Sequence, residues 1–251
     1  MRVASFKEDI DVSNKNVFKR NEVKFLLAPD DKAAILSAMS EYMRLDKYGR
    51  TTIRNLYYDD DSFRLIRRSI EKPKYKEKLR VRSYRRVEPG DEVFVELKKK
   101  FQGTVFKRRV SLPERDAMAW LAGGELPCDS QINREIEYFR DFYGNLEPKL
   151  FLSYEREAYF SLLGDDLRIT FDENIYARET DLSLCSKAYG TPLLPEGRTL
   201  MEIKCSGAIP LWLVRVLSER KIYKISFSKY GVAYAEHIAP GLAQKEYVYG
   251  K

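Results

Sequence analysis

EKLRVRSY (residues 77–84) and VFVELKKK (residues 93–100) alternate charged and apolar side chains with a period of two residues. Successive side chains of a β-strand point to opposite faces, so this alternation predicts two strands, each with one charged and one apolar face. The charged face of the first strand carries Lys78, Arg80 and Arg82. The charged face of the second carries Glu96, Lys98 and Lys100. These two stretches set the pattern for the rest of the chain.

Five further stretches repeat this alternation: KRNEVKFLL (19–27), VFKRRV (105–110), LSYEREAY (152–159), LRITFDEN (167–174) and LMEIKCS (200–206). Their polar faces carry, in chain order, Arg20, Glu22, Lys24, Lys107, Arg109, Tyr154, Arg156, Arg168, Thr170, Asp172, Glu202 and Lys204. A β-bulge in VFKRRV would turn Arg108 to the polar face instead. We therefore expect at least seven strands whose charged faces repeat Arg or Lys with an occasional Glu.

Four amphipathic helices are predicted between these strands. One opens at Pro29–Asp30, with Ile35, Leu36, Met39, Tyr42 and Met43 on one face; another follows a capping box at Ser111–Glu114 and stops at Gly123; a third runs from Ser130 to Gly144; a fourth spans about 210–220. Helices packed on the apolar strand faces leave the charged faces on one side of the sheet. We expect an α+β fold in which an antiparallel sheet curls into a β-barrel with a charged lumen, because closure removes exposed edges. The alternative is a flat α+β sheet with a solvated charged face.

Composition limits the partners. The chain has 251 residues, a net charge of +7 and an isoelectric point of about 9.1, which favours an anionic partner: nucleic acid, an acidic membrane or a phosphorylated molecule. We do not expect nucleic acid as the main ligand, because the aromatic residues do not interleave with the basic ones as a stacking platform. The sequence contains no apolar run long enough for a transmembrane segment and no signal core. Three scattered cysteines favour a cytoplasmic location.

The residue types favour phosphate chemistry. Arginine binds phosphate through a two-pronged fork and lysine acts as a point charge. Glu22, Glu96 and Glu202 would repel phosphates unless a hard cation such as Mg²⁺ or Mn²⁺ intervened, although each could simply pair with its basic neighbours. The sequence has neither a GxxxxGK[ST] loop nor a GxGxxG turn, and its single histidine, His237, is expected at the surface. Phosphoryl transfer requires none of these.

A set of ordered motifs carries a resemblance to a known family. Glu22-Val23-Lys24 resembles a reduced ExExK signature of the triphosphate tunnel metalloenzymes (CYTH-like superfamily). The motifs that follow are NLYYDDDSF (55–63), KLRVRSY (78–84), VELKKK (95–100), FKRRV (106–110), SYEREAY (153–159), LRITFD (167–172), LMEIKCSG (200–207) and FSKYG (227–231). Their order resembles the VTC-type polyphosphate polymerase domain. The likeness covers about residues 18–238, and we expect a domain at 18–240 with an arm at 1–17 and a tail at 241–251.

The resemblance implies a tunnel barrel and roles for particular residues. Phosphates would be held by Lys24, Arg80, Arg82, Lys98, Lys107, Arg156, Lys204 and Lys229. Glu202 would be the main ligand of Mn²⁺ or Mg²⁺, with Glu96 and Glu22 as helpers, and Tyr57, Arg80 and Arg82 would contact the nucleotide. The chain departs from the pattern at Arg20, where the superfamily has a second glutamate, and at Ser226, where some members have a basic residue.

The resemblance also implies an activity: transfer of the terminal phosphoryl group of ATP to a polyphosphate chain. Two alternatives stay open, a tunnel-type triphosphatase acting on inorganic or nucleoside triphosphate, and a non-catalytic polyphosphate-binding module. Eukaryotic relatives carry membrane and regulatory domains, whereas this sequence resembles the stand-alone bacterial form. A separate membrane protein is left open as a partner.

Overall fold

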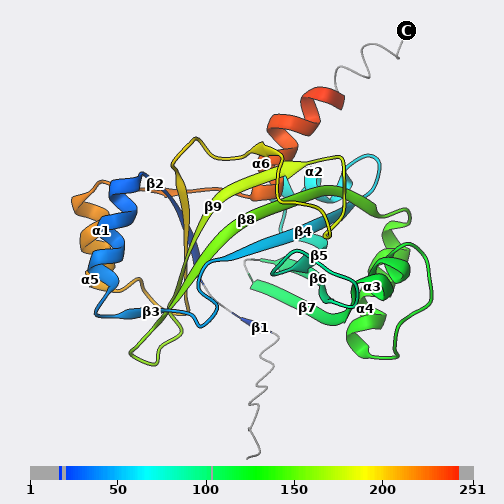
Figure 1. The fold of residues 1–251 in the computed structure, drawn as a ribbon, viewed down its shortest axis with the longest axis horizontal. Coiled ribbons are helices and arrows are strands. Elements are labelled where there is room, and N and C mark those ends of the chain that lie inside the picture. Colours follow the sequence, from blue (N-terminus) through cyan, green and yellow to red (C-terminus); the bar gives the residue numbers. More distant parts are fainter. Residues whose placement is uncertain (1–16, 19–20, 103, 243–251) are drawn as a thin grey trace, which may run out of the picture.

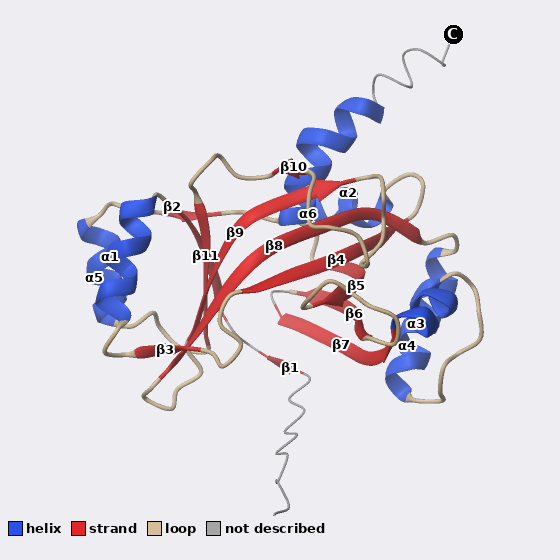
Figure 2. Ribbon diagram, viewed as in Figure 1, coloured by secondary structure: helices blue, strands red, loops and turns tan. Residues whose placement is uncertain are grey.

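One large antiparallel sheet dominates the computed structural model, which describes residues 17–18, 21–102 and 104–242 (Figures 1 and 2). Its strands are β1 (Val17–Phe18), β2 (Asn21–Leu27), β3 (Met43–Leu45), β4 (Thr51–Asp59), β5 (Tyr75–Ser83), β6 (Glu92–Phe101), β7 (Thr104–Pro113), β8 (Glu147–Ser161), β9 (Arg168–Arg178), β10 (Thr191–Pro192), β11 (Thr199–Cys205) and β12 (Lys224–Ile225). The helices are α1 (Pro29–Met39), α2 (Arg64–Ile70), α3 (Glu114–Leu121), α4 (Gln131–Tyr143), α5 (Leu211–Glu219), α6 (Lys229–Ala233) and the π-helical turn η1 (Tyr234–Ile238). The predicted α+β class is confirmed.

The strands follow the order β1-β7-β6-β5-β4-β8-β9-β11-β2-β12, with β3 attached to β8 and β10 to β9. Among the described residues the hydrogen-bonded pairs form an open path and do not close the sheet into a barrel. Closure therefore stays a prediction. The seven stretches of alternating sequence all contain strands, as expected.

The register between β5 and β6 shows how alternation sorts the side chains. Leu79 faces Leu97 across the ladder, and the next position pairs Arg80 with Glu96. Apolar pairs thus gather on one face and charged pairs on the other. Leu79 and Leu97 are fully buried.

Helices cover the apolar faces at two ends of the sheet (Figure 1). At one end α3 and α4 bury Trp120 and Phe139 against the apolar side chains of β5 and β6. At the other end α1 and α5 bury Ile35 and Leu213 against β2, β9 and β11. This arrangement agrees with the expected packing and leaves the charged faces uncovered by these helices.

A third apolar cluster joins α2, α6 and η1 to the middle of the sheet. It contains Ile66 of α2, Tyr230 of α6 and Ile238 of η1, packed against residues of β4 and β8 such as Leu150. This cluster fixes the chain around residues 227–231, the FSKYG motif, next to the charged face.

The helix predictions need two corrections. The expected capping box at Ser111–Glu114 is wrong. Ser111 lies in β7, where its hydroxyl donates a hydrogen bond to the Glu92 carboxylate, and α3 starts only at Glu114, after Pro113. The face predicted for the first helix extended too far, because α1 ends at Met39 and Met43 belongs to β3. The third helix is confirmed, with the Ser130 hydroxyl accepting a bond from the Asn133 backbone and Gly144 at the end.

Some predicted features lie outside the described residues, and one differs from the structure in its exposure. Arg20 and most of the arm and the tail lie outside the described residues. His237 is half-buried in η1 rather than fully exposed. None of the described helices combines the length and the apolar character that crossing a membrane requires.

Candidate functional site

The sheet curves around its charged face, so that strands far apart in the ladder share contacts. Lys24 Nζ of β2 donates to the carbonyl of Phe227 at 2.7 Å, and Lys78 Nζ of β5 donates to Ser228 Oγ at 3.1 Å. Strands β4, β8, β9 and β11 stand between β2 and β5 in the sheet order. A single short segment, 227–228, therefore reaches both strands only because the sheet is strongly bent.

One part of this concave face is built on a carboxylate pair, Asp172 and Glu202. Arg156 forms a two-pronged ion pair with Asp172, with nitrogen-to-oxygen distances of 2.5 and 2.6 Å. Lys229 Nζ lies 2.6 Å from Asp172 and 3.3 Å from Glu202. These cations lower the pKa of both carboxyl groups although burial opposes it, so both are ionised at neutral pH.

Glu202 has looser contacts than its neighbour. Its oxygens lie 3.3–3.7 Å from nitrogen atoms of four cations: Lys24, Arg156, Lys204 and Lys229. Its side chain is only 7% exposed. Glu22, on the adjacent strand, lies 3.2 Å from Lys24 and 3.9 Å from Lys204. Glu202 is thus a buried carboxylate without a short bond to any of these cations.

A second part of the face is the Glu96 cluster, formed by Glu96 with Arg80, Arg82, Lys107 and Arg109. The cations lie at 2.7 Å (Arg80 and Lys107), 2.9 Å (Arg109) and 3.8 Å (Arg82) from the Glu96 oxygens. Glu96 is 1% exposed, and these cations lower its pKa against the effect of burial. Arg108 points the other way, to Glu135 of α4, so the bulge considered for VFKRRV is absent and Lys107 is the inward residue.

Tyr154 and Asn55 link the two parts. Arg82 donates to Asn55 Oδ1 at 2.9 Å and to the Tyr154 hydroxyl at 3.2 Å. The Lys229 and Arg156 head groups lie 4.6 and 5.1 Å from the centre of the Tyr154 ring. Tyr57 accepts a bond from Arg80 Nη1 at 2.9 Å. The two anionic centres therefore belong to one continuous polar network.

The same face carries a lysine row, Lys78, Lys98 and Lys107, which face each other across β5, β6 and β7. Among the described residues neither Lys78 nor Lys98 forms an ion pair within 4.0 Å. Burial and nearby cations lower the pKa of Lys98 and lower that of Lys78 to about 8. Glu22 is the nearest anionic influence on Lys98 and lies across the concave face, on β2. Lys107 pairs with Glu96 at 2.7 Å, whereas the charges of Lys78 and Lys98 have no ion-pair partner in the described part of the chain.

The structure brings together every site residue predicted from the sequence on this one face, from Lys24 on β2 to Lys229 on α6. Sequence reasoning assigned no role to Asp172, Asn55, Tyr154 or Lys78. Alternation had placed Asp172 and Lys78 on the right face, but their partners come from distant strands. Arg168 lies opposite Lys204 in the β9–β11 ladder, on the face that alternation predicted, but its side chain is 54% exposed and lies 3.9 Å from Asp46.

The described residues contain no group of three histidine, cysteine, aspartate or glutamate side chains that could hold a metal ion. Asp172 and Glu202 are the closest approach to such a group, since both contact Lys229 and Arg156. Glu96 lies in the other part of the network. The three predicted metal ligands thus do not form one protein-only metal site.

The sequence finds no match among curated proteins. Its fold is also found among solved structures. One, a protein from Bacillus halodurans described as a "putative adenylate cyclase", is 15% identical, with a TM-score of 0.50 over 84% of this chain and 96% of that chain. Another, from Vibrio parahaemolyticus and described in the same words, is 10% identical, with a TM-score of 0.43 over 85% and 96% of the two chains. Identities this low concern the fold alone.

A family comparison is more specific. The VTC domain matches residues 19–238, which include all the strands from β2 to β12 and helix α6. The match contains every residue of the concave polar face described above. This chain belongs to the VTC domain family.

Proposed function

We propose that this protein transfers the terminal phosphoryl group of ATP to the end of a polyphosphate chain, in a metal-dependent reaction. The proposal includes closure of the curved sheet into a tunnel around the substrate and a functional unit spanning residues 18–240. The observation that carries it is the facing pair Lys78 and Lys98, which lie inside a curved sheet and form no ion pair with any described residue. Like charges held this close repel one another, and a polyanion is the ligand that would offset the repulsion.

The cations would bind phosphates in two ways. Lys78 and Lys98 are free to contact phosphate oxygens directly, since among the described residues no carboxylate forms an ion pair with either lysine. Arg80, Lys107 and Arg109 are fixed by Glu96, so their remaining donors would be oriented before substrate arrives. Pre-oriented donors lower the reorganisation needed in the transition state.

Asp172 and Glu202 would have different roles. Asp172 holds Arg156 and Lys229 through short ion pairs and is suited to positioning them. Glu202, with longer contacts, is suited to exchange its lysine partners for a divalent cation. Mg²⁺ in phosphate-transfer sites is held by one or two carboxylates together with substrate oxygens, so the arrangement fits a metal that arrives with its substrate.

Bound Mn²⁺ or Mg²⁺ would supply charge neutralisation at the transferred phosphoryl group. Glu202 would hold it, and Glu22 lies close enough to the same lysines to assist. Glu96 is less suited to that role because four cations surround it. Arg156, Lys204 and Lys229 would keep the phosphate chain aligned for attack by its terminal oxygen.

The nucleotide would lie near Tyr57, whose hydroxyl already contacts Arg80. Arg82 is anchored by Asn55 and Tyr154, leaving part of its guanidinium for phosphate. A separate membrane protein that receives the polymer is compatible with this arrangement.

Two substitutions separate binding from catalysis. Glu202→Gln should keep or strengthen polyphosphate binding, because it removes a negative charge, and should lower turnover by roughly 100-fold or more. Lys98→Met should weaken polyphosphate binding about tenfold, since it removes a charged donor. Lys47→Met, at an exposed lysine, removes the same charge elsewhere and controls for net charge. Equal loss of turnover in all three variants would contradict the assignment.

A further inference from the structure

Arg54 lies buried on the opposite face of β4 from the candidate site and lacks a counter-charge. It is 8% exposed. Its guanidinium donates one long hydrogen bond, from Nη1 to the Thr52 carbonyl at 3.4 Å, and its Nε has no partner. Within the described part of the chain no carboxylate pairs with it. A buried charge without a partner is strongly destabilising, so the position calls for an explanation.

The charges nearest to Arg54 have the same sign. Burial, followed by Arg86 and Arg178, lowers the pKa of its guanidinium. Arg178 is fully engaged: it donates to the carbonyls of Thr180 and Asp181 and stacks 3.6 Å from the centre of the Phe151 ring. Arg86 is exposed and donates to the carbonyl of Cys185. Arg54 and Arg86 thus keep positive charge that no described carboxylate balances.

Ser153 is a second buried donor beside Arg54. The two residues face each other in the β4–β8 ladder. Ser153 is 1% exposed, and its hydroxyl has no hydrogen-bond partner. Two unsatisfied polar groups at adjacent ladder positions are uncommon in a protein interior. A shared partner would satisfy both.

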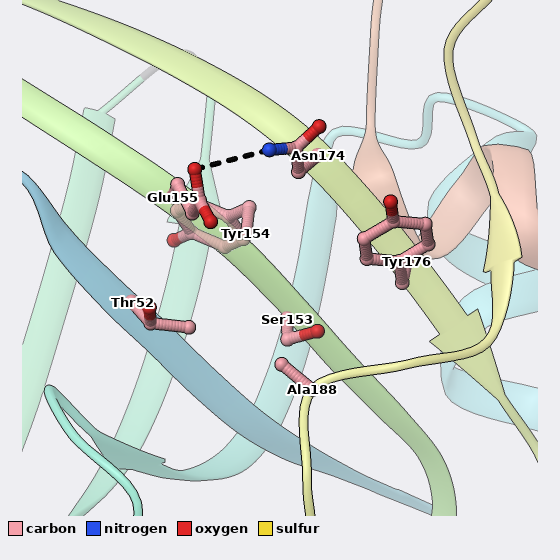
Figure 3. Close-up of a pocket in the computed structure, with 7 residues that line it drawn as sticks. All are labelled: Thr52, Ser153, Tyr154, Glu155, Asn174, Tyr176 and Ala188. Atoms are coloured by element: carbon pink, nitrogen blue, oxygen red, sulfur yellow. Dashed lines mark hydrogen bonds between the residues drawn. The ribbon is translucent and has the colours of Figure 1, made fainter.

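A cavity of about 270 Å³ is lined by Ser153, one of these donors (Figure 3). Its walls include Ser153, Thr52 and Tyr176 from the sheet, and Ala188 from the loop between β9 and β10. Thr52 is also the residue that Arg54 contacts. The only carboxylate in the wall, Glu155, already pairs with Arg50 and accepts a bond from Asn174 at 3.0 Å, as Figure 3 shows for Asn174. The cavity wall therefore contains Ser153 and Thr52, the ladder partner and the hydrogen-bond acceptor of Arg54.

We propose that Arg54 and Ser153 bind a small tetrahedral oxyanion, inorganic phosphate or pyrophosphate, on the outer face of the sheet. The anion would neutralise Arg54 and accept from Ser153 Oγ. The arginine fork suits phosphate oxygens, and the cavity volume suits a small anion and not a long polymer. The site backs onto the candidate active site, because Asn55 and Tyr154, which hold Arg82, directly follow Arg54 and Ser153 in the chain. Binding here requires no phosphoryl transfer at the other face.

The test follows the Arg54 Nε–H signal in ¹⁵N NMR spectra, assigned by its loss in Arg54→Met, during titration with inorganic phosphate. The signal should shift saturably in the wild type, and Ser153→Ala should weaken the apparent affinity several-fold. Because each arginine has its own signal, binding at the candidate active site is read separately. An Arg54 signal that stays fixed while the signals of Arg80 or Arg156 move would overturn the proposal. A shift caused by long-chain polyphosphate but not by inorganic phosphate would also overturn it.

Thermal unfolding gives an independent readout. In phosphate-free buffer Arg54→Met should have a Tm equal to or above that of the wild type, since a buried unpaired charge is removed. Added phosphate should raise the Tm of the wild type and of Arg44→Met more than that of Arg54→Met. Arg44, which stacks on Phe160 at another part of the fold, matches the change in net charge. An equal gain in all three proteins would contradict a phosphate site at Arg54.

Discussion

Tyr57 and Lys78 are neighbours whose ionisation is linked. Burial alone would raise the pKa of Tyr57, but Arg80, Lys78 and Arg82 lower it to about 8. Burial lowers the pKa of Lys78 to about 8, although Tyr57 opposes the shift. Each group therefore changes charge in a range where free tyrosine and lysine keep their protons. The candidate site thus carries a pH dependence of its own.

The direction of this dependence follows from the protons bound in each state. Between pH 8 and 10 the unfolded chain keeps protons on both groups, whereas the folded protein has released them, so their contribution to stability rises with pH. Relative to Tyr57→Phe, the wild type should gain roughly 1–3 kcal/mol over this range. Urea unfolding at several pH values measures the difference. A difference that stays constant would show that Tyr57 has an ordinary pKa.

Binding of an anionic ligand should favour the protonated forms of Lys78 and Tyr57. Polyphosphate favours protonated Lys78 and un-ionised Tyr57, so its affinity should fall as the pH rises through about 8. The fall should be smaller in Lys78→Met, because that variant has lost the charge that titrates. Calorimetric titration in buffers of different ionisation enthalpy measures the proton uptake directly. Proton release on binding would contradict the assignment.

Helix α6 is held in place by a contact outside the candidate site. Tyr230 donates to Asp59 Oδ2 at 3.0 Å, and the same carboxylate accepts backbone bonds from Leu65 and Ile66 at the start of α2. Lys229, the preceding residue of α6, contacts the carboxylate pair. Asp59 therefore ties α2 and α6 to the end of β4 and positions Lys229.

Tyr230→Phe should separate this positioning effect from general stability. Losing the hydrogen bond should lower the free energy of unfolding by about 1–2 kcal/mol and weaken polyphosphate binding, because Lys229 is no longer fixed. Ser130→Ala removes the N-cap of α4 at the far end of the sheet and should cost about 1 kcal/mol with no change in binding. Unfolding and binding measurements on both variants provide the comparison. If the two affected binding alike, α6 would have no special role.

The sequence predicts some elements much better than others. Long alternating stretches such as residues 93–100 predict strands and their faces, because the pleat leaves only two orientations. The helix at Ser130 carries its own capping signal, whereas α2 and α6 are short and depend on Asp59, which lies in β4. The capping-box pattern at Ser111 failed because β7 continues through that serine. Short helices and strand ends are set by contacts that a local pattern does not contain.

The sequence predicted which residues belong to the candidate site, but not which of them form ion pairs with one another. Alternation and family likeness name Glu202, Arg80 and Lys229, yet neither indicates that Asp172 is the tight partner of Arg156 or that Glu202 has longer contacts. Those distinctions depend on the curvature of the sheet and on the register between strands. Arg54 illustrates the same limit, since its lack of a partner is visible only once the neighbouring strands are placed.

The affinity of this positively charged protein for polyphosphate should depend on the salt concentration. Its net charge is +7, and the lysine row concentrates positive charge on the concave face. Binding of long polyphosphate should weaken steeply as salt rises, because many phosphate contacts are screened together. Affinity measured across a salt series tests this expectation. Salt-independent binding would argue against a tunnel lined with cations.

The most direct test of phosphoryl transfer is to incubate the purified protein with ATP and Mn²⁺ or Mg²⁺, with and without a short polyphosphate primer. Free phosphate, ADP and acid-stable polymer are measured in the same reaction. We predict ADP and polymer in parallel, with little free phosphate, and loss of both products in Glu202→Gln. Free phosphate without polymer would contradict the transferase proposal and indicate a triphosphatase, and no turnover with either metal would leave a polyphosphate-binding module.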